Sequence, residues 1–252
     1  MNTNNNFACI KLSDNTIVCK PAKKQVGGNN GGTWAVNVSA LLKDYTSLGE
    51  ERHLALLFLN IRRYTQLMET DTSVDVPYLV KILFQIFQES IRDAGGTIVE
   101  TAADSLYAVF GKGEDIRDAM SLALESANTV IQNLKAFNQS YAKPYLGHDI
   151  EVCVGLHEGD VLVGHSDHKG QESIEVMGFP MNLMSRLESV TRELNNNLVM
   201  SEEAYQSLDN PKPRSTRMSV ALKGTAKPVA VRLLGEPYIA QHAQRAKTVT
   251  TC

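Results

Sequence analysis

The stretch Leu57-Phe-Leu-Asn-Ile-Arg-Arg-Tyr-Thr65 is the most informative part of this chain. Apolar residues run from Leu54 to Leu59 and stop at Asn60, after which a helical pattern begins. A buried strand that ends on one polar residue delivers that side chain to the end of a sheet, where functional groups gather. Asn60 is therefore the first candidate for a functional residue.

A second strand, further along the chain, ends on a carboxylate at Asp104. Two carboxylates on adjacent strand ends would hold a divalent cation against phosphate groups. Here the first of the two positions, Asn60, carries an amide. Whether the chain is an enzyme or the remnant of one depends on that substitution.

The composition is that of an ordinary globular protein. The 252 residues are 43% apolar and 21% charged, which fits one large domain with flanking segments. A net charge of −3 provides no electrostatic footprint for nucleic acid, and no apolar run approaches the roughly 20 residues that span a bilayer. Residues 1–6 form no signal-peptide core, and the four cysteines lack metal-ligand spacing. We therefore expect free thiols, no membrane span and a cytoplasmic location.

The composition changes twice along the chain, which predicts three parts. Residues 1–50 form an Asn- and Gly-rich, partly flexible extension, residues 51–236 the main domain, and residues 237–252 a polar tail. Within the extension we expect two short strands and one helix, over Phe7–Ile10, Thr16–Cys19 and Trp34–Leu48.

Strand and helix patterns alternate through the main domain. The predicted strands span Leu54–Asn60, Thr97–Ala102, Ser105–Phe110, Ile150–Leu156, Asp160–Gly164, Ser173–Met177, Leu198–Ser201, 216–222 and 229–234. The predicted helices span Val76–Ala94, Glu114–Tyr141, Pro180–Leu194 and 202–208. The segment His157-Glu-Gly159 is expected to join two of the strands. The order predicts an α/β (α+β) fold with a ferredoxin-like βαββαβ core, a mixed, mostly antiparallel sheet, and helices mainly on one face.

Five collinear blocks between residues 54 and 235 resemble the catalytic domain of the class III nucleotide cyclases, the adenylate and guanylate cyclases. They are Phe58-Leu-Asn-Ile-Arg-Arg-Tyr-Thr65, where that family has F-x-D-I-x-x-F-T; Gly95-Gly-Thr-Ile-Val-Glu-Thr-Ala-Ala-Asp104, close to V-E-T-I-G-D; Val154-Gly-Leu-His-Glu-Gly-Asp-Val-Leu-Val-Gly164, against V-G-I-H-T-G-x-V-x-x-G; Gly178-Phe-Pro-Met-Asn-Leu-Met-Ser-Arg-Leu-Glu-Ser189, against G-D-x-V-N-x-A-x-R-x-E-S; and Leu222-Lys-Gly224 followed by Pro228-Val229. The resemblance implies a role in cyclic-nucleotide signalling. The implied reaction converts a nucleoside triphosphate to its 3′,5′-cyclic monophosphate and pyrophosphate.

The resemblance assigns the two metal positions, for Mg²⁺ or Mn²⁺, to Asn60 and Asp104. An amide oxygen is a poor ligand for these cations, so we expect a loss on the order of a thousandfold in rate. The residue-level alternatives are a turn residue for Asp104 and a strand-end cap for Asn60. Arg63 and Ala103 also stand where the family has glycine, so both turns at the site depart from its pattern.

The remaining site residues also follow from the resemblance. The turn over Ile61, Arg63, Tyr64 and Thr65 is expected to bind phosphate, and Arg63 is either a phosphate ligand or a solvated loop arginine. Asn182 would orient the ribose, and Arg186 would stabilise charge on the α-phosphate, four residues apart on one helix face. Lys223 is the candidate phosphate-binding lysine, with Lys227 as its competitor.

Two carboxylates occupy the positions that contact the base. Glu100 stands where guanylate cyclases have Glu, and a carboxylate can accept hydrogen bonds from the N1 and N2 edge of guanine. Glu175 matches neither the guanylate nor the adenylate pattern, and Phe179 adds an aromatic ring beside it. GTP is the first expectation for the substrate, and ATP remains open.

The resemblance implies a site shared between two subunits, with the metal positions from one and Asn182 and Arg186 from the other. A homodimer or a heterodimer with another cyclase domain would provide this arrangement. Three functions stay open at this point. The first is a cyclase of impaired activity, and the main alternative is an inactive cyclase-homology domain that regulates by binding a nucleotide or a partner. The third is a cyclase-fold module with no nucleotide site.

Overall fold

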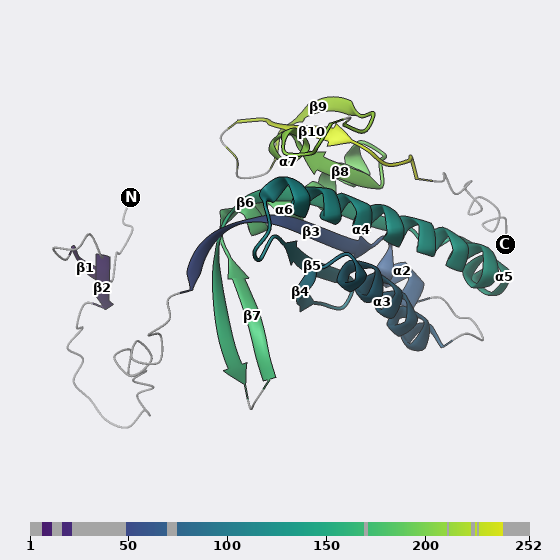
Figure 1. Cartoon of the computed structure of the whole chain (residues 1–252). Coiled ribbons are helices and arrows are strands. Elements are labelled where there is room, and N and C mark those ends of the chain that lie inside the picture. The colour runs from purple at the N-terminus through teal and green to yellow at the C-terminus, as the bar shows by residue number, and fades with distance from the viewer. Residues whose placement is uncertain are drawn as a thin grey trace, which may run out of the picture. The chain divides into compact units, whose positions relative to one another are not determined.

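The computed structural model describes residues 7–11, 17–21, 49–69, 75–168, 171–210, 212–222, 225 and 227–238 (Figure 1). The chain divides into two units, Met1–Thr46 and Ser47–Cys252. In the first unit, strands β1 (Phe7–Lys11) and β2 (Ile17–Pro21) pair antiparallel. The two short strands expected there are confirmed, and the helix expected over 34–48 lies outside the described residues.

The second unit contains a mixed sheet and the helices that pack on it. Its strands are β3 (Glu50–Ile61), β4 (Thr97–Thr101), β5 (Ser105–Phe110), β6 (Val152–His168), β7 (Gln171–Met177), β8 (Leu198–Ser201), β9 (Thr216–Val220) and β10 (Val229–Leu233). Its helices are α2 (Tyr64–Met68), α3 (Val76–Asp93), α4 (Ile116–Phe137), the π-helix η1 (Asn138–Ala142), α5 (Lys143–Leu146), α6 (Phe179–Glu193) and α7 (Glu202–Gln206).

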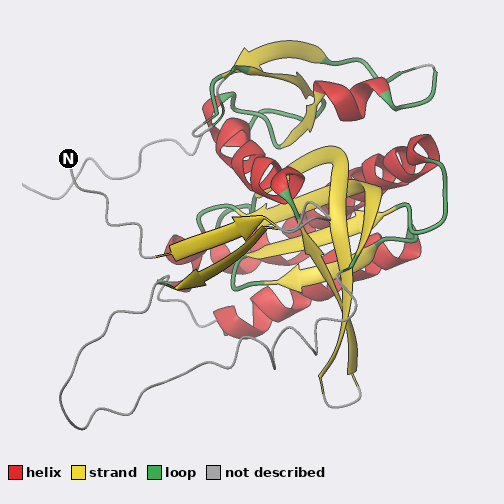
Figure 2. Cartoon of the chain, turned by 90° about the vertical axis from the view of Figure 1, so that its left-hand side faces the viewer, coloured by secondary structure: helices red, strands yellow, loops and turns green. Residues whose placement is uncertain are grey.

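The sheet has the strand order β4-β5-β3-β6-β8-β10-β9, and β7 pairs with β6. All neighbours are antiparallel except β6 and β8, which run parallel. Beyond the body of the sheet, β6 and β7 continue as a two-stranded arm (Figures 1 and 2). The predicted fold class, an α+β fold with a mostly antiparallel sheet, is confirmed.

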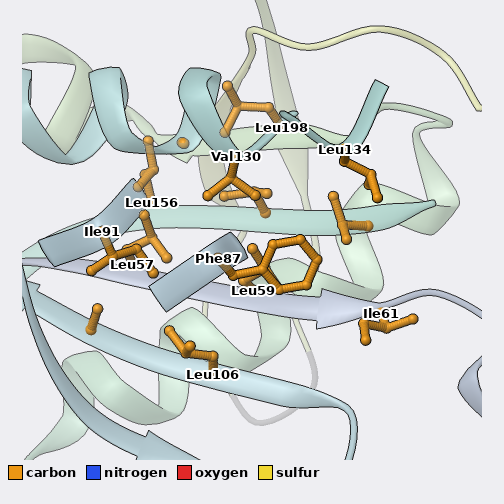
Figure 3. Packing of buried hydrophobic residues seen from close by; sticks show 14 of the residues in the cluster. Leu57, Leu59, Ile61, Phe87, Ile91, Leu106, Val130, Leu134, Leu156 and Leu198 are labelled. Atoms are coloured by element: carbon orange, nitrogen blue, oxygen red, sulfur yellow. The ribbon is translucent and has the colours of Figure 1, made fainter. Parts of the chain in front are cut away.

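The central strand β3 is buried on both faces. Its odd-numbered residues, such as Leu57 and Leu59, pack against helices α3 and α4 around Phe87 (Figure 3). Its even-numbered residues, such as Leu56, pack toward Met184 of α6 on the opposite face. Successive strand residues alternate between faces, so a strand covered on both sides appears in the sequence as a continuous apolar run.

The prediction of a turn at His157-Glu-Gly159 is wrong, because β6 runs without interruption from Val152 to His168. Residues 157–159 pair with Leu54–Leu56 of β3, so their backbone groups bond across the sheet. Gly159 is small for a packing reason, since a Cβ atom there would lie 2.5 Å from Cγ of Pro180. The glycine indicated a turn in the sequence and allows a close helix contact in the fold.

His157 is buried inside this strand, and its Nδ1 lies 2.8 Å from Oγ of Ser201. Burial lowers the pKa of His157 to about 4, while nearby Glu203 raises it and His53 lowers it further. The folded protein therefore keeps a neutral imidazole at pH values where the unfolded chain takes up a proton.

We expect the free energy of unfolding to fall as the pH drops from about 6.5 to about 4, because the unfolded chain binds the proton first. The loss attributable to His157 would approach about 3 kcal/mol at the acidic end. Urea unfolding of the wild type and of His157→Gln at several pH values measures this loss as the difference between their slopes. Parallel curves for the two proteins would show that the folded state also protonates His157.

Tyr238 is buried at 8% exposure, so packed residues continue past position 236. In the part of the chain that the structure describes, no helix combines the length and the apolar character needed to cross a bilayer.

Candidate functional site

The ends of β3 and of the β4–β5 turn meet at Asn60 and Asp104. The backbone N–H of Ile61 donates to the carbonyl oxygen of Asp104 at 2.7 Å, and Asn60 pairs with Ser105 across the sheet. Both Asn60 and Asp104 are partly exposed. The tight hairpin between β4 and β5 thus brings the backbone of Asp104 beside the end of β3, next to Asn60.

Strand alternation puts Asn60 on the α6 side of the sheet. Leu56 and Phe58 belong to the cluster that includes Met184 of α6, and Asn60 follows them at the period of two. Ile61, on the other side, is 1% exposed within the core beneath α3 and α4. The side chain of Ile61 is therefore unavailable to a ligand, and only its backbone could contribute.

The turn after β3 contains a residue whose backbone conformation is sterically unfavourable. Arg63, the residue before α2, has φ 56 and ψ 34. This is the left-handed region of backbone conformation, which residues other than glycine seldom adopt. Its carbonyl accepts a hydrogen bond from the N–H of Leu67 at 3.0 Å, which begins the helix. The structure therefore explains why a glycine would suit this position.

Replacing Arg63 by Gly is expected to raise the free energy of unfolding by about 1 kcal/mol, because glycine adopts this conformation without a steric penalty. The melting temperature should rise by roughly 2–4 °C, and thermal unfolding measures it directly. Arg63→Ala is the matched control, since it removes the guanidinium and keeps the strain. Equal stabilisation by Ala and Gly would attribute the effect to the side chain and contradict the backbone explanation.

The two predicted base-contacting carboxylates lie on different strands. Glu100 is exposed on β4, opposite Tyr107 and directly after a register shift at Ile98. Glu175 is exposed on β7, opposite Gly164 of β6. Strands β4 and β7 approach each other although they are not paired. The fold therefore brings two strands that carry carboxylates near one another on the exposed surface.

Asn182 and Arg186 lie on the flank of α6 that does not enter the core. Helix α6 buries Leu183, Met184 and Leu187, whereas Asn182 is exposed and Arg186 partly exposed. Among the described residues, no hydrogen bond or ion pair joins this flank to Asn60 or Asp104. Lys223, the predicted phosphate-binding lysine, lies outside the described residues, and Lys227 is exposed.

An apolar surface flanks the start of α6. Met177 and Phe179 are 50% and 66% exposed, which is high for large apolar side chains. They lie between Glu175 on β7 and Asn182 on α6. Two large apolar side chains are therefore exposed close together in the chain, next to residues that the sequence assigned to the site.

The donor set at the strand ends is incomplete for a divalent cation. Asp104 provides a carboxylate and Asn60 an amide, and hard cations prefer carboxylate oxygen. Within the described ranges, no group of three or more His, Cys, Asp or Glu side chains could hold a metal ion. One carboxylate and one amide therefore fall short of the donor set that a pair of divalent cations needs.

Sequence reasoning missed the residues that anchor the turn over residues 60–65, which we call the site turn. Arg62 forms an ion pair with Glu151 at 2.5 Å, and its guanidinium lies 4.1 Å from the ring centre of Tyr238. The sequence shows only an arginine in a loop, because both partners are remote in the chain. No local pattern could have indicated this arrangement.

Comparisons with known proteins agree with this fold. The sequence profile of the adenylate and guanylate cyclase catalytic domain matches residues 48–235. An adenylate cyclase of Anabaena cylindrica is 27% identical over 187 residues, which cover 71% of this chain and 36% of that protein. This chain thus spans about a third of the length of the curated relatives that it matches.

Two solved structures show the same fold at low sequence identity. The adenylyl cyclase CyaB from P. aeruginosa has a TM-score of 0.64 at 20% identity, covering 75% of this chain and 96% of that chain. The guanylate cyclase domain of RhGC from Catenaria anguillulae, in complex with GTP, has a TM-score of 0.61 at 20% identity, covering 75% of this chain and 100% of that chain. With the profile match over most of its length, this chain belongs to the family of adenylate and guanylate cyclase catalytic domains.

Proposed function

We propose that this chain is a class III nucleotide cyclase domain of reduced catalytic capacity that acts in cyclic-nucleotide signalling. The observation that carries the proposal is that Asn60 and an intact Asp104 lie at neighbouring positions of the fold, joined by the hydrogen bond from the N–H of Ile61 to the carbonyl oxygen of Asp104. The scaffold supplies both positions, and only one of them carries a carboxylate. Losing one carboxylate weakens phosphate neutralisation and lowers the rate without removing the site.

The residues of this chain would divide the work between substrate binding and transition-state stabilisation. Mg²⁺ or Mn²⁺, if held by Asp104 with weak support from Asn60, would neutralise charge on the triphosphate. The turn over Ile61, Arg63, Tyr64 and Thr65 would bind phosphate oxygens. The guanidinium of Arg63, which is exposed, adds a positive charge that can form two hydrogen bonds with one phosphate.

The α6 flank would act on the reacting atoms. Asn182 would orient the ribose, and Arg186 would stabilise the charge that develops on the α-phosphate, together with Lys223. The ribose 3′-hydroxyl would lose its proton to water, its oxygen would form a bond to the α-phosphorus, and the bond from that phosphorus to the departing pyrophosphate would break. The exposed flank and the neighbouring Met177 and Phe179 support a dimer in which one subunit supplies this flank to the strand ends of the other.

Guanine is the base that the carboxylate of Glu100 favours. Glu100 is an acceptor, and guanine presents N–H donors at its N1 and N2 positions where adenine presents none at N1. GTP is therefore the proposed substrate, and ATP is the competitor in the test.

A second candidate function is supported by a separate observation. Arg63 projects from a strained turn where the family has glycine, and Phe179 and Glu175 also depart from the family pattern. Departures gathered at the site, within a retained scaffold, favour a domain that binds a nucleotide or a partner and regulates without turnover.

The test is a product assay with the purified 252-residue chain. Incubation with ATP, GTP, CTP or UTP plus Mn²⁺, followed by mass spectrometry, would detect the cyclic product and identify its base. Slow formation of cyclic GMP is the expected result. Nucleotide binding without any product, including in the Asn60→Asp variant, would favour the regulatory domain.

A further inference from the structure

Residues 235–238, which follow β10, are held by three consecutive asparagines. The side-chain oxygens of Asn196, Asn197 and Asn195 accept hydrogen bonds from the N–H groups of Gly235, Glu236 and Tyr238 at 3.0, 2.8 and 3.2 Å. The backbone of 197 also donates to the carbonyl of 236 at 2.9 Å. This segment is therefore fixed on the sheet through its backbone, which determines where Tyr238 lies.

Tyr238 reaches from this segment to the end of the sheet where the candidate site lies. Its hydroxyl donates to Sγ of Cys153 at 3.1 Å, and Cys153 pairs with Asn60 across β3 and β6. Burial raises the pKa of Tyr238 above its ordinary value, so the hydroxyl stays protonated and remains a donor. The ring therefore keeps a defined position behind the site turn.

Arg62 of the site turn packs against that ring. Its guanidinium carbon lies 4.1 Å from the ring centre, its Nη1 lies 2.5 Å from Glu151, and its backbone N–H donates to the carbonyl of Glu151 at 2.8 Å. The Arg62 and Glu151 side chains are only 18% and 14% exposed. We call Arg62, Glu151 and Tyr238 the arginine clamp.

The clamp leaves one donor of Arg62 unsatisfied by hydrogen bonds. Within the described chain, Nε of Arg62 is buried and has no hydrogen-bond partner. A partly desolvated guanidinium needs compensation, and the face of an aromatic ring provides it through its quadrupole. The Tyr238 ring is therefore part of what keeps this arginine in place.

The residue after Arg62 is the strained Arg63, with φ 56. A residue other than glycine keeps a left-handed backbone conformation only where the surrounding structure holds it there. On the preceding side, the turn is tied by the N–H of Ile61 to Asp104 and by the backbone and side chain of Arg62 to Glu151. These anchors oppose relaxation of the turn.

We propose that the arginine clamp positions the site turn over residues 60–65, so that the C-terminal segment 235–238 is a structural part of the nucleotide site. Arg62, Glu151 and Tyr238 act as positioning residues, because they shape the turn from behind and touch no substrate. This proposal rests on the proposed function for its link to nucleotide binding. Its link to the conformation of the turn is tested separately.

The first test is hydrogen exchange of the full chain in Tyr238→Leu, with Tyr238→Phe as the matched control. Leu removes the ring beneath Arg62, whereas Phe keeps the ring and loses only the hydroxyl. We expect amides in residues 61–69 to exchange about tenfold faster in Tyr238→Leu and near the wild-type rate in Tyr238→Phe. Glu151→Gln, which preserves shape and removes the charge, should accelerate the same peptide.

The second test measures nucleotide kinetics in the Asn60→Asp background. Tyr238→Leu should raise KM for Mn²⁺–GTP by about tenfold while kcat changes by less than about twofold, because a loosened turn loses ground-state phosphate binding. A purely structural role would instead lower the active fraction and reduce kcat alone.

The proposal would be overturned if Tyr238→Leu left hydrogen exchange in residues 61–69 unchanged. It would also be overturned if the variant accelerated exchange equally throughout the unit Ser47–Cys252. A raised KM without faster exchange would also overturn it, because Tyr238 would then act by another route. If residues 61–69 exchange faster and no variant makes a cyclic product, the proposed function fails and the control of the turn by the clamp stands.

Discussion

Replacing Asn60 by Asp is expected to increase the rate of cyclic-nucleotide formation by on the order of a hundredfold to a thousandfold. The substitution is nearly isosteric and adds a carboxylate at a strand end that is already tied to Asp104 through the N–H of Ile61. The backbone needs no rearrangement, so the gain reflects charge alone. Product formation with Mn²⁺ and GTP, measured by mass spectrometry against the wild type, tests it.

A double variant provides the control for this gain. Asn60→Asp combined with Asp104→Asn keeps one carboxylate and one amide and exchanges their positions. Its rate should stay within about tenfold of the wild type, because a lone carboxylate holds the cation weakly from either position. If Asn60→Asp makes no more product than the wild type, residue 60 is not the limiting defect and the metal argument is wrong.

In the Asn60→Asp background, Asp104→Ala and Arg186→Ala are each expected to lower activity by on the order of a hundredfold or more, and a mixture of the two should recover it. The reason is that the resemblance to the cyclase family implies a site in which one subunit supplies the strand ends and the other supplies the α6 flank. A head-to-tail pair of unlike subunits would contain one site with both parts intact and one site lacking both.

Random pairing of equal amounts predicts recovery of about a quarter of the parent activity, because half of the dimers are mixed and each has one intact site. The measurement is product formation as a function of mixing ratio, with the dimer fraction followed by light scattering. Phe179→Ser serves as an interface control, since it removes a 66% exposed ring and should weaken pairing without altering the proposed catalytic groups. A mixture no more active than its components would place both parts of the site within one subunit.

The elements that repeat a regular pattern could be predicted from the sequence. The apolar run into Asn60 predicted a buried strand, and β3 is covered on both faces in the structure. The helical spacing over 76–94 predicted α3, which ends one residue earlier at Asp93. The predictions for these segments are correct because the local periodicity of each segment agrees with its tertiary environment.

Gly159 shows where such reasoning fails. In the sequence it belongs to a turn signal, and in the fold it lies inside β6 against Pro180. A glycine is compatible with a turn and with a close contact, and only the neighbouring helix decides between them. The same limit applies to Arg63, whose left-handed conformation depends on how both ends of the turn are tied.

The residues of the candidate site were also predicted on two different grounds, the pattern of strand ends and the family resemblance. The sequence indicated Asn60 and Asp104 as ends of successive strands, and the fold brings them to neighbouring positions; their role in metal binding stays a prediction. Glu100, Glu175, Asn182 and Arg186 were assigned through a family resemblance, and their roles also stay predictions.

The sequence by itself determined the main strands and helices and their order, apart from the false break at His157-Glu-Gly159, together with the membership in the cyclase family and the amide at position 60, since each depends on residue identity at a local spacing. Only the tertiary structure decided that β6 is continuous, that Arg63 is strained and that Tyr238 packs behind the site turn. The physical reason is that hydrogen bonds, ion pairs and ring contacts between residues remote in the chain depend on three-dimensional packing and leave no periodic pattern in the sequence.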